Sequence, residues 1–268
     1  MKINYFKYLL LVFLFLTSVI IYLSLVGIET GKFNQQIKDK VIQTNKDLDI
    51  SLKKVKLTLN PFKLQLNAKT VGAIIYYSKR PLQLKHVKTQ VSLGSFFKNK
   101  LVSSNFEVST KSILLKDLVK FIRAITNKPE LLILETMIKN GYVALDLNLN
   151  LDQNGKIKND YEVNGFLREG KIKFLKNIDF ENINFLFTLK KENFIIKNSK
   201  FTTDKVDFNS DLLKAVKKVD GYFVEGKIQN SESILSNNLI KLLNLKDFNF
   251  DNSKFNSKSK FKFEINNK

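Results

Sequence analysis

The chain of 268 residues contains no cysteine, and its only histidine is His86. Without cysteine it has no disulfide framework, no thiolate nucleophile and no zinc–thiolate site. Histidine-centred catalytic triads and multi-histidine metal sites are hard to build from one imidazole. His86 stands in a strand-like segment without a recognisable partner, and a lone strand histidine is more typical of a surface or edge position than of a catalyst. We therefore expect neither a cofactor nor a metal.

Arginine is scarce although the formal net charge is +20. Arg80, Arg123 and Arg168 are the only arginines, and lysines supply the rest of the positive charge. Proteins that read nucleic acids usually use arginine for bidentate contacts, and they gather their basic residues on one helix or arm. Here the lysines are spread along alternating segments, which favours a solvated lysine face. Attraction to anionic lipid head groups is a secondary possibility, and no nucleic-acid partner is expected.

Charge is absent from one long segment, the 21 residues from Tyr8 to Ile28. A hydrocarbon core of roughly 30 Å needs about 20 apolar residues in a helix, so this run is long enough to cross a membrane. Thr17, Ser18 and Ser24 can return their hydroxyls to the helix backbone and do not weaken this prediction.

A cleaved signal peptide is the alternative, because Lys2 and Lys7 form a plausible basic region before the run. Against it, the run exceeds the usual length of roughly 7–15 residues, and Val26–Ile28 is a poor cleavage site. We predict a retained signal-anchor at 8–28, with residues 1–7 as a short cytoplasmic tail.

Period-two alternation dominates the remaining 240 residues, which can bury a sizeable core. A polar connecting helix is expected first, at 29–47, and a first β-region follows at 48–115. Its predicted strands flank Asn60-Pro61 and then cover 71–77, 82–93 and 101–110.

Two helices, 116–126 and 129–139, are predicted to form a helical hairpin within 116–140, with Pro129 in the first turn and Gly141 as the stop. A second β-region at 141–268 should then begin with the clear alternation of 143–151. A hairpin turn at 152–155 leads into a strand at 156–166. Further strands are expected at 171–174, 183–189, 194–196, 205–209, 221–229 and 254–265, with short helices at 211–219 and 231–245.

The alternating strands are one-sided, as expected when one face of a sheet meets apolar matter and the other meets water. The last alternating segment, 254–265, has no obvious cap and would leave an open sheet edge. Either a longer β-structure continues from it or a partner supplies the next strand. The fold class is therefore mainly β with a few helices, an antiparallel sheet following an N-terminal transmembrane helix.

The chain resembles the start of AsmA-like proteins in the order of its anchor, its polar helix, Asn60-Pro61-Phe62-Lys63-Leu64-Gln65-Leu66, the segment 80–93 and then Leu101 to Asp117. That superfamily includes the YhdP and TamB types and is related to chorein-type lipid-transfer proteins. The blocks 152–157, 163–165 and 222–226 are similar to later strand repeats of the YhdP type. The resemblance covers most of the chain, but its motifs are pattern-level and carry no invariant chemistry.

The resemblance implies an inner-membrane anchor, a periplasmic β-sheet curled into a hydrophobic groove, and transport of phospholipid toward the outer membrane. The chain is shorter than members thought to bridge the envelope. With strands lying across a groove, its 240 residues after the anchor are too few to span a periplasm. The expected partners are the inner membrane and phospholipid or lipopolysaccharide acyl chains. The candidate groove-lining residues are the two alternating sets Leu57, Leu59, Phe62, Leu64, Leu66 and Val143, Leu145, Leu147, Leu149, Leu151. For each of them, ordinary packing in a core is the alternative.

Two other functions remain open at this point. One is an envelope assembly scaffold with a closed β-core that recruits a partner strand. The other is a lipopolysaccharide-export component of the one-anchor β-jellyroll type. An enzyme is not expected, because no glycine-rich phosphate loop or nucleophile elbow occurs in the sequence.

Overall fold

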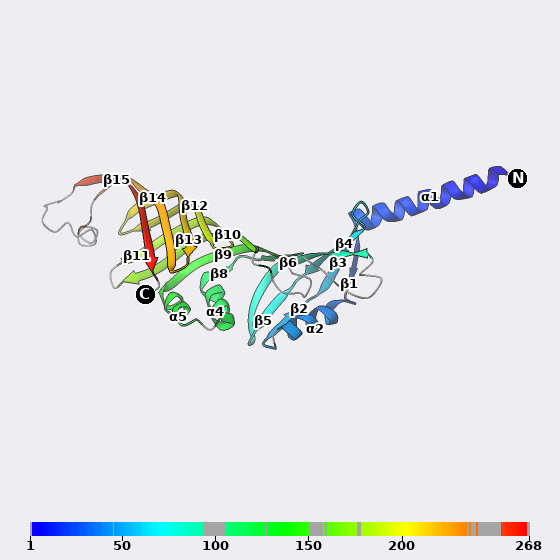
Figure 1. Ribbon diagram of the computed structural model, residues 1–268, viewed down its shortest axis with the longest axis horizontal. Helices are drawn as coiled ribbons and strands as arrows, with labels where there is room; N and C mark the ends of the chain where they lie inside the picture. Colours follow the sequence, from blue (N-terminus) through cyan, green and yellow to red (C-terminus); the bar gives the residue numbers. More distant parts are fainter. Residues whose placement is uncertain are drawn as a thin grey trace. The chain divides into compact units, whose positions relative to one another are not determined.

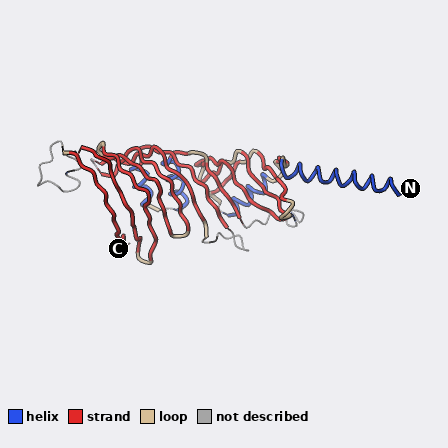
Figure 2. Tube along the Cα trace, turned by 90° about the horizontal axis from the view of Figure 1, so that it is seen from above, coloured by secondary structure: helices blue, strands red, loops and turns tan. Residues whose placement is uncertain are grey.

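The computed structural model describes residues 2–44, 46–93, 105–126, 128–150, 158, 160–175, 178–234, 236, 240 and 253–266. Within these residues, 15 strands form one open antiparallel sheet, accompanied by an apolar N-terminal helix (Figures 1 and 2). The predicted fold class is confirmed. The chain divides into two units, Met1–Ser109 with Asn148–Lys158, and Thr110–Leu147 with Asn159–Lys268, and each is described by itself.

Unit 1 begins with α1 (Lys2–Leu25), whose segment Phe6–Leu25 is long and apolar enough to cross a membrane. Within α1 the hydroxyls of Thr17 and Ser24 donate hydrogen bonds to backbone carbonyls four residues earlier, at 2.8 and 2.7 Å, as predicted. The helix ends three residues earlier than the apolar run suggests. Gly27 adopts a left-handed φ of 74°, the conformation of a helix-terminating glycine.

The other elements of unit 1 with described bounds are one helix and seven strands. They are α2 (Asn34–Thr44), β1 (Ile28–Thr30), β2 (Leu48–Ser51), β3 (Lys54–Asn60), β4 (Gln65–Val71), β5 (Ile74–Tyr77), β6 (Arg80–Ser92) and β7 (Asn105–Thr110). The strand order is β1-β3-β4-β6-β7, and β5 pairs with both β2 and β6.

The core of unit 1 is centred on β6, where exposed and buried residues alternate from Pro81 to His86. Leu82, Leu84 and His86 point inward, together with Val55 of β3 and Ile50 of β2. Because α2 packs against β2, it covers this part of the unit, and the predicted connecting helix is thereby observed at Asn34–Thr44.

The segment after Asn60-Pro61 differs from the prediction. Residues 61–64 form a turn rather than the start of a strand, and β4 begins at Gln65. The Asn60 side chain accepts a hydrogen bond from the Lys63 N–H at 3.2 Å, and Leu64 has a φ of 48°. Asparagine favours such local bonds over a strand ladder, which is why the alternation breaks here.

The elements of unit 2 with described bounds are two helices and eight strands. They are β8 (Ile113–Leu114), α4 (Leu115–Thr126), α5 (Glu130–Met137), β9 (Ile138–Asn150), β10 (Glu162–Leu175), β11 (Ile178–Lys190), β12 (Asn193–Thr203), β13 (Val206–Lys218), β14 (Gly221–Ile234) and β15 (Lys254–Asn266). From β9 to β15 the strands are neighbours in chain order.

The predicted helical pair is present as α4 and α5, which pack on each other (Figure 1). Val119 and Phe121 of α4 are buried, and an ion pair joins Arg123 to Glu135 of α5 at 2.9 Å. The second helix is shorter than predicted. It ends at Met137 because Ile138 is extended and almost fully buried as the first residue of β9.

The predicted helix at 211–219 is wrong, because 211–218 belongs to β13, which is hydrogen-bonded to β12 and β14. The strand ladders on both sides override the helical spacing of its leucines and valines. Residues 231–234 likewise extend β14, while 235, 237–239 and 241–245 of the second predicted helix lie outside the described residues. So does the predicted turn at 152–155, and β10 begins at Glu162.

Candidate functional site

The sheet of unit 2 has two chemically different faces, which the strand registers define. Residues opposite each other on neighbouring strands share a face, and each strand alternates between faces. Two apolar rows cross the six strands β10–β15 on one face. The first row is Gly165, Phe187, Ile196, Leu213, Gly226 and Phe261, and the second is Val163, Leu189, Phe194, Ala215, Val224 and Phe263. We call these twelve residues the apolar rows.

None of the residues in the apolar rows is buried, and Phe263 is 48% exposed. The rings of Phe187 and Phe194 lie 6.1 Å apart, and those of Phe261 and Phe263 lie 5.7 Å apart. These centroid distances are typical of favourable aromatic contacts. The rows therefore form a continuous, ordered apolar strip that remains partly accessible to solvent.

Two glycines lie within the first row, beneath neighbouring side chains. A Cβ at Gly165 would lie 2.6 Å from the ring of Phe187, and one at Gly226 would lie 2.9 Å from the ring of Phe261. The two rings occupy the space above these glycines. A side chain at either glycine position would need the same space.

The described helices α4 and α5 lie over one end of this face. A Cβ at Gly141 would lie 3.4 Å from Leu167 and 3.6 Å from Leu115 at the start of α4. Leu167 pairs with Phe185 and so shares the face of the apolar rows. The helix α4 contacts β8 and α5 contacts β10, so the helices pack on this face at that end. Across β11–β15 the residues of the apolar rows are half-buried or exposed.

The reverse face carries charged residues and also exposed leucines, since Leu186 and Leu212 are each 49% exposed on it. The row between the two apolar rows consists of Asn164, Thr188, Ile195, Lys214, Glu225 and Lys262. Glu225 pairs with Lys214 at 3.9 Å and with Lys262 at 3.8 Å. The hydroxyl of Thr188 donates a 2.7 Å hydrogen bond to Asn164. The row between the apolar rows is therefore suited to water.

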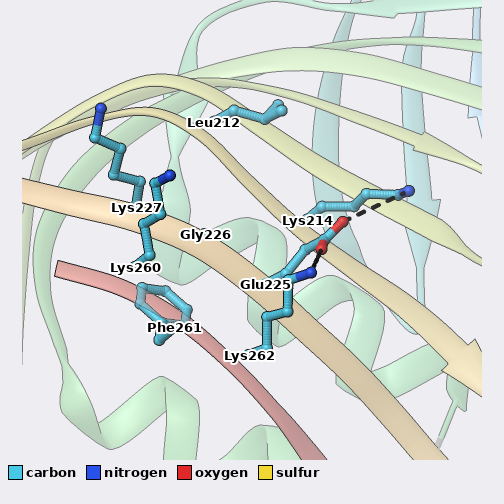
Figure 3. Close-up of a pocket in the computed structure, with 8 residues that line it drawn as sticks. All are labelled: Leu212, Lys214, Glu225, Gly226, Lys227, Lys260, Phe261 and Lys262. Carbon is cyan, nitrogen blue, oxygen red and sulfur yellow. Dashed lines mark ion pairs between the residues drawn. The ribbon is translucent and has the colours of Figure 1, made fainter.

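A shallow depression on the reverse face is lined by four lysines and one glutamate, together with Leu212, Gly226 and Phe261 (Figure 3). Lys227 and Lys260 lie opposite each other on β14 and β15. The neighbouring Lys258 and Lys260 lower the pKa of Lys227, which reports the local excess of positive charge. This side of the sheet would attract anionic groups.

The predicted groove residues divide into four groups. Leu57, Leu59 and Leu66 are half-buried on one face of the β3–β4 hairpin, whereas Phe62 and Leu64 are exposed in its turn. On β9, Val143 is buried and Leu145, Leu147 and Leu149 are half-buried. Leu151 lies outside the described residues.

His86 is buried in unit 1, with 6% of its surface exposed, so the expectation of a surface or edge position is wrong. Its Nε2 lies 3.2 Å from Glu107 and 3.1 Å from the hydroxyl of Ser109. In a catalytic triad the serine and the carboxylate contact different ring nitrogens. Here both contact Nε2, Nδ1 is buried without a hydrogen-bond partner, and Ser109 is buried, so this cluster has the geometry of a structural polar core.

The sequence carried a signal for this cluster that the prediction did not use. Glu107 and Ser109 are two residues apart on β7, as His86 and Lys88 are on β6, so each pair shares a face. Consecutive strands usually pair, which brings the two pairs together. The apolar rows were missed because 211–219 was assigned as a helix, which removed Leu213 and Ala215 from the sheet.

Comparison with protein-family models, with curated proteins and with solved structures finds no match to this chain. Among the described residues, no group of acidic, histidine or cysteine side chains could hold a metal ion. The apolar rows and α1 are the features of the chain that bear on its function.

Proposed function

We propose that this protein is a membrane-anchored lipid-handling protein that binds acyl chains along the apolar rows of unit 2. The observation that carries the proposal is a partly exposed apolar strip that crosses six strands, with a mainly polar and charged row directly behind it. Contiguous exposed apolar surface of this kind marks binding sites. The apolar helix α1 would hold the protein at the membrane that supplies the lipid.

The length of the strip supports an acyl chain as ligand. Six strands span five spacings of about 4.8 Å, or about 24 Å. One leaflet contributes half of a hydrocarbon core of roughly 30 Å, so an extended acyl chain fits along one row. Each methylene removed from water contributes about 0.8 kcal/mol, which gives a chain of ordinary length ample affinity without one decisive side chain.

The proposed setting is the envelope of a diderm bacterium, as the AsmA-like resemblance implies. The protein would be anchored in the inner membrane with its sheet in the periplasm, and it would act in phospholipid transport toward the outer membrane. Lipopolysaccharide is the other ligand of the same chemistry. Binding requires no covalent step, so the proposed activity is not enzymatic.

Photo-crosslinking at two adjacent isoleucines tests the proposal. Ile196 lies in the first apolar row, and Ile195 lies in the charged-face row opposite Thr188 and Lys214. Both side chains are half-buried, so they form a matched pair. Benzoylphenylalanine would replace either residue in the full chain, expressed in a diderm bacterium with ³²P-labelled lipids.

The expected result is a labelled lipid adduct from position 196 and little from position 195. Mass spectrometry of the adduct then separates phospholipid from lipopolysaccharide. Absence of an adduct at 196 in a folded protein, or equal adducts at both positions, would overturn the proposal.

A second candidate function is strand recruitment by β15, which has a hydrogen-bonded neighbour, β14, on one side only among the described strands. The lysines of β15 would favour an acidic partner strand. A protein adduct from the same photo-crosslinker placed on β15, without a lipid adduct at position 196, would favour this scaffold function.

A further inference from the structure

The turn between β3 and β4 presents apolar side chains to solvent. Phe62 is 96% exposed and Leu64 is 65% exposed, with Lys63 between them. The turn is held in shape by the Asn60–Lys63 hydrogen bond and by a 3.1 Å bond from the Leu93 N–H to the Leu64 carbonyl. An ordered turn that exposes two large apolar side chains requires an explanation.

The location of this turn explains why its apolar side chains are exposed. The chain passes from α1 into β1 through Val26 and Gly27 alone, and β1 pairs with β3 so that Ile28 lies opposite Leu57. A Cβ at Gly27 would collide with the Leu57 carbonyl and lie 2.7 Å from Thr58. The end of α1 is thus in contact with β3 (Figure 1).

The direction of β3 carries the turn past this contact. Because β1 and β3 are antiparallel, β3 runs back toward α1 as its numbering increases. Asn60 lies two residues beyond Thr58, or about 7 Å at the rise of a strand, and the turn follows directly. The turn therefore lies beside the C-terminal end of α1, the level at which a membrane-spanning helix leaves the hydrocarbon core.

We propose that the β3–β4 turn is a second membrane contact, in which Phe62 and Leu64 insert into the bilayer interface beside α1. Lys63 would lie at head-group level, where an ammonium meets lipid phosphate. Apolar side chains at the interface bury area that water otherwise covers. This inference concerns unit 1 and does not depend on lipid binding by the apolar rows.

Tryptophan fluorescence can test the contact because the chain has no tryptophan. The variant Phe62→Trp places a single emitter in the turn. The full chain would be reconstituted in vesicles of phosphatidylcholine and phosphatidylglycerol, with and without brominated acyl chains that quench tryptophan on contact.

Gln83→Trp is the matched control. Gln83 is exposed on β6, and Ser92 of the same strand pairs with Gln65 next to the turn. The nine residues from Ser92 to Gln83 place the control about 30 Å along β6 from the turn.

Transfer of one such apolar side chain favours the inserted position by at least about tenfold, so brominated lipid should reduce the Phe62→Trp emission by about twofold or more. The Gln83→Trp emission should be almost unchanged. Adding Leu64→Asp, which suits the left-handed backbone there, should reduce the quenching of Phe62→Trp. Equal quenching of Phe62→Trp and Gln83→Trp, or an emission of Phe62→Trp unaffected by brominated lipid, would overturn the inference.

Discussion

Two glycines of the first apolar row provide a sharp test of how closely this sheet is packed. A Cβ at Gly165 would lie 2.6 Å from the Ala144 carbonyl oxygen, which is backbone and cannot turn away, and 2.6 Å from the Phe187 ring. A Cβ at Gly226 would meet the ends of the Leu213 and Phe261 side chains. These side chains are half-buried and can rotate.

We therefore expect alanine at Gly165 and alanine at Gly226 to change the free energy of unfolding by different amounts. Overpacking costs about 1–3 kcal/mol, and replacing glycine by alanine returns about 0.4–1 kcal/mol through the unfolded state. We expect Gly165→Ala to destabilise unit 2 by about 1–2 kcal/mol, which lowers the melting temperature by about 2–8 °C for a protein of this size. Gly226→Ala should stay within about 1 kcal/mol of the wild type, because its neighbours can move.

The assay is thermal unfolding of the full chain in lipid nanodiscs, followed by the circular dichroism of the strands. The double variant Gly165→Ala with Phe187→Leu identifies the obstacle. If the Ala144 carbonyl is limiting, the second substitution gives no rescue. Equal losses for Gly165→Ala and Gly226→Ala, or full rescue by Phe187→Leu, would refute the reasoning.

Two further predictions concern charged groups. The hydrogen bond from Lys88 lowers the pKa of Glu107 below its ordinary value of 4.5, and this contribution to stability is present above pH 4.5 and lost as the pH falls through the folded-state pKa. Glu107→Gln should therefore be less stable than wild type at pH 7 but not in acid. Midpoints of urea unfolding measured across this pH range would show the change. A difference in stability that does not depend on pH would contradict the role given to the Glu107 carboxylate. For the half-buried pair of Arg123 and Glu135, a double-mutant cycle to alanine should give a coupling energy of about 1 kcal/mol, a value between those of exposed and of buried ion pairs. A coupling energy of zero would mean that the pair does not hold α4 against α5.

The sequence predicts those parts of the fold in which local pattern and tertiary pairing agree. The apolar run of α1, the alternation at 143–149 and the last strand are of this kind. The segment 211–219 is not, because its apolar residues suit a helix until β12 and β14 pair with it.

The candidate site was harder to predict for the same reason. The apolar rows exist only when the register of six strands is known, since each strand contributes two residues to them. The environment of His86 likewise depends on the partners that β7 supplies, at 21 and 23 residues' separation. Strand pairing is a long-range property, which period-two patterns suggest but do not specify.

The two-residue passage from α1 to β1 also has a mechanical consequence. Because Gly27 packs against Leu57, the junction contains no flexible linker that would let the first unit rotate relative to α1. Rotation or tilt of α1 would be transmitted directly to β1 and β3. In a membrane that α1 spans, we therefore expect the first unit to keep a fixed height and orientation at the bilayer surface.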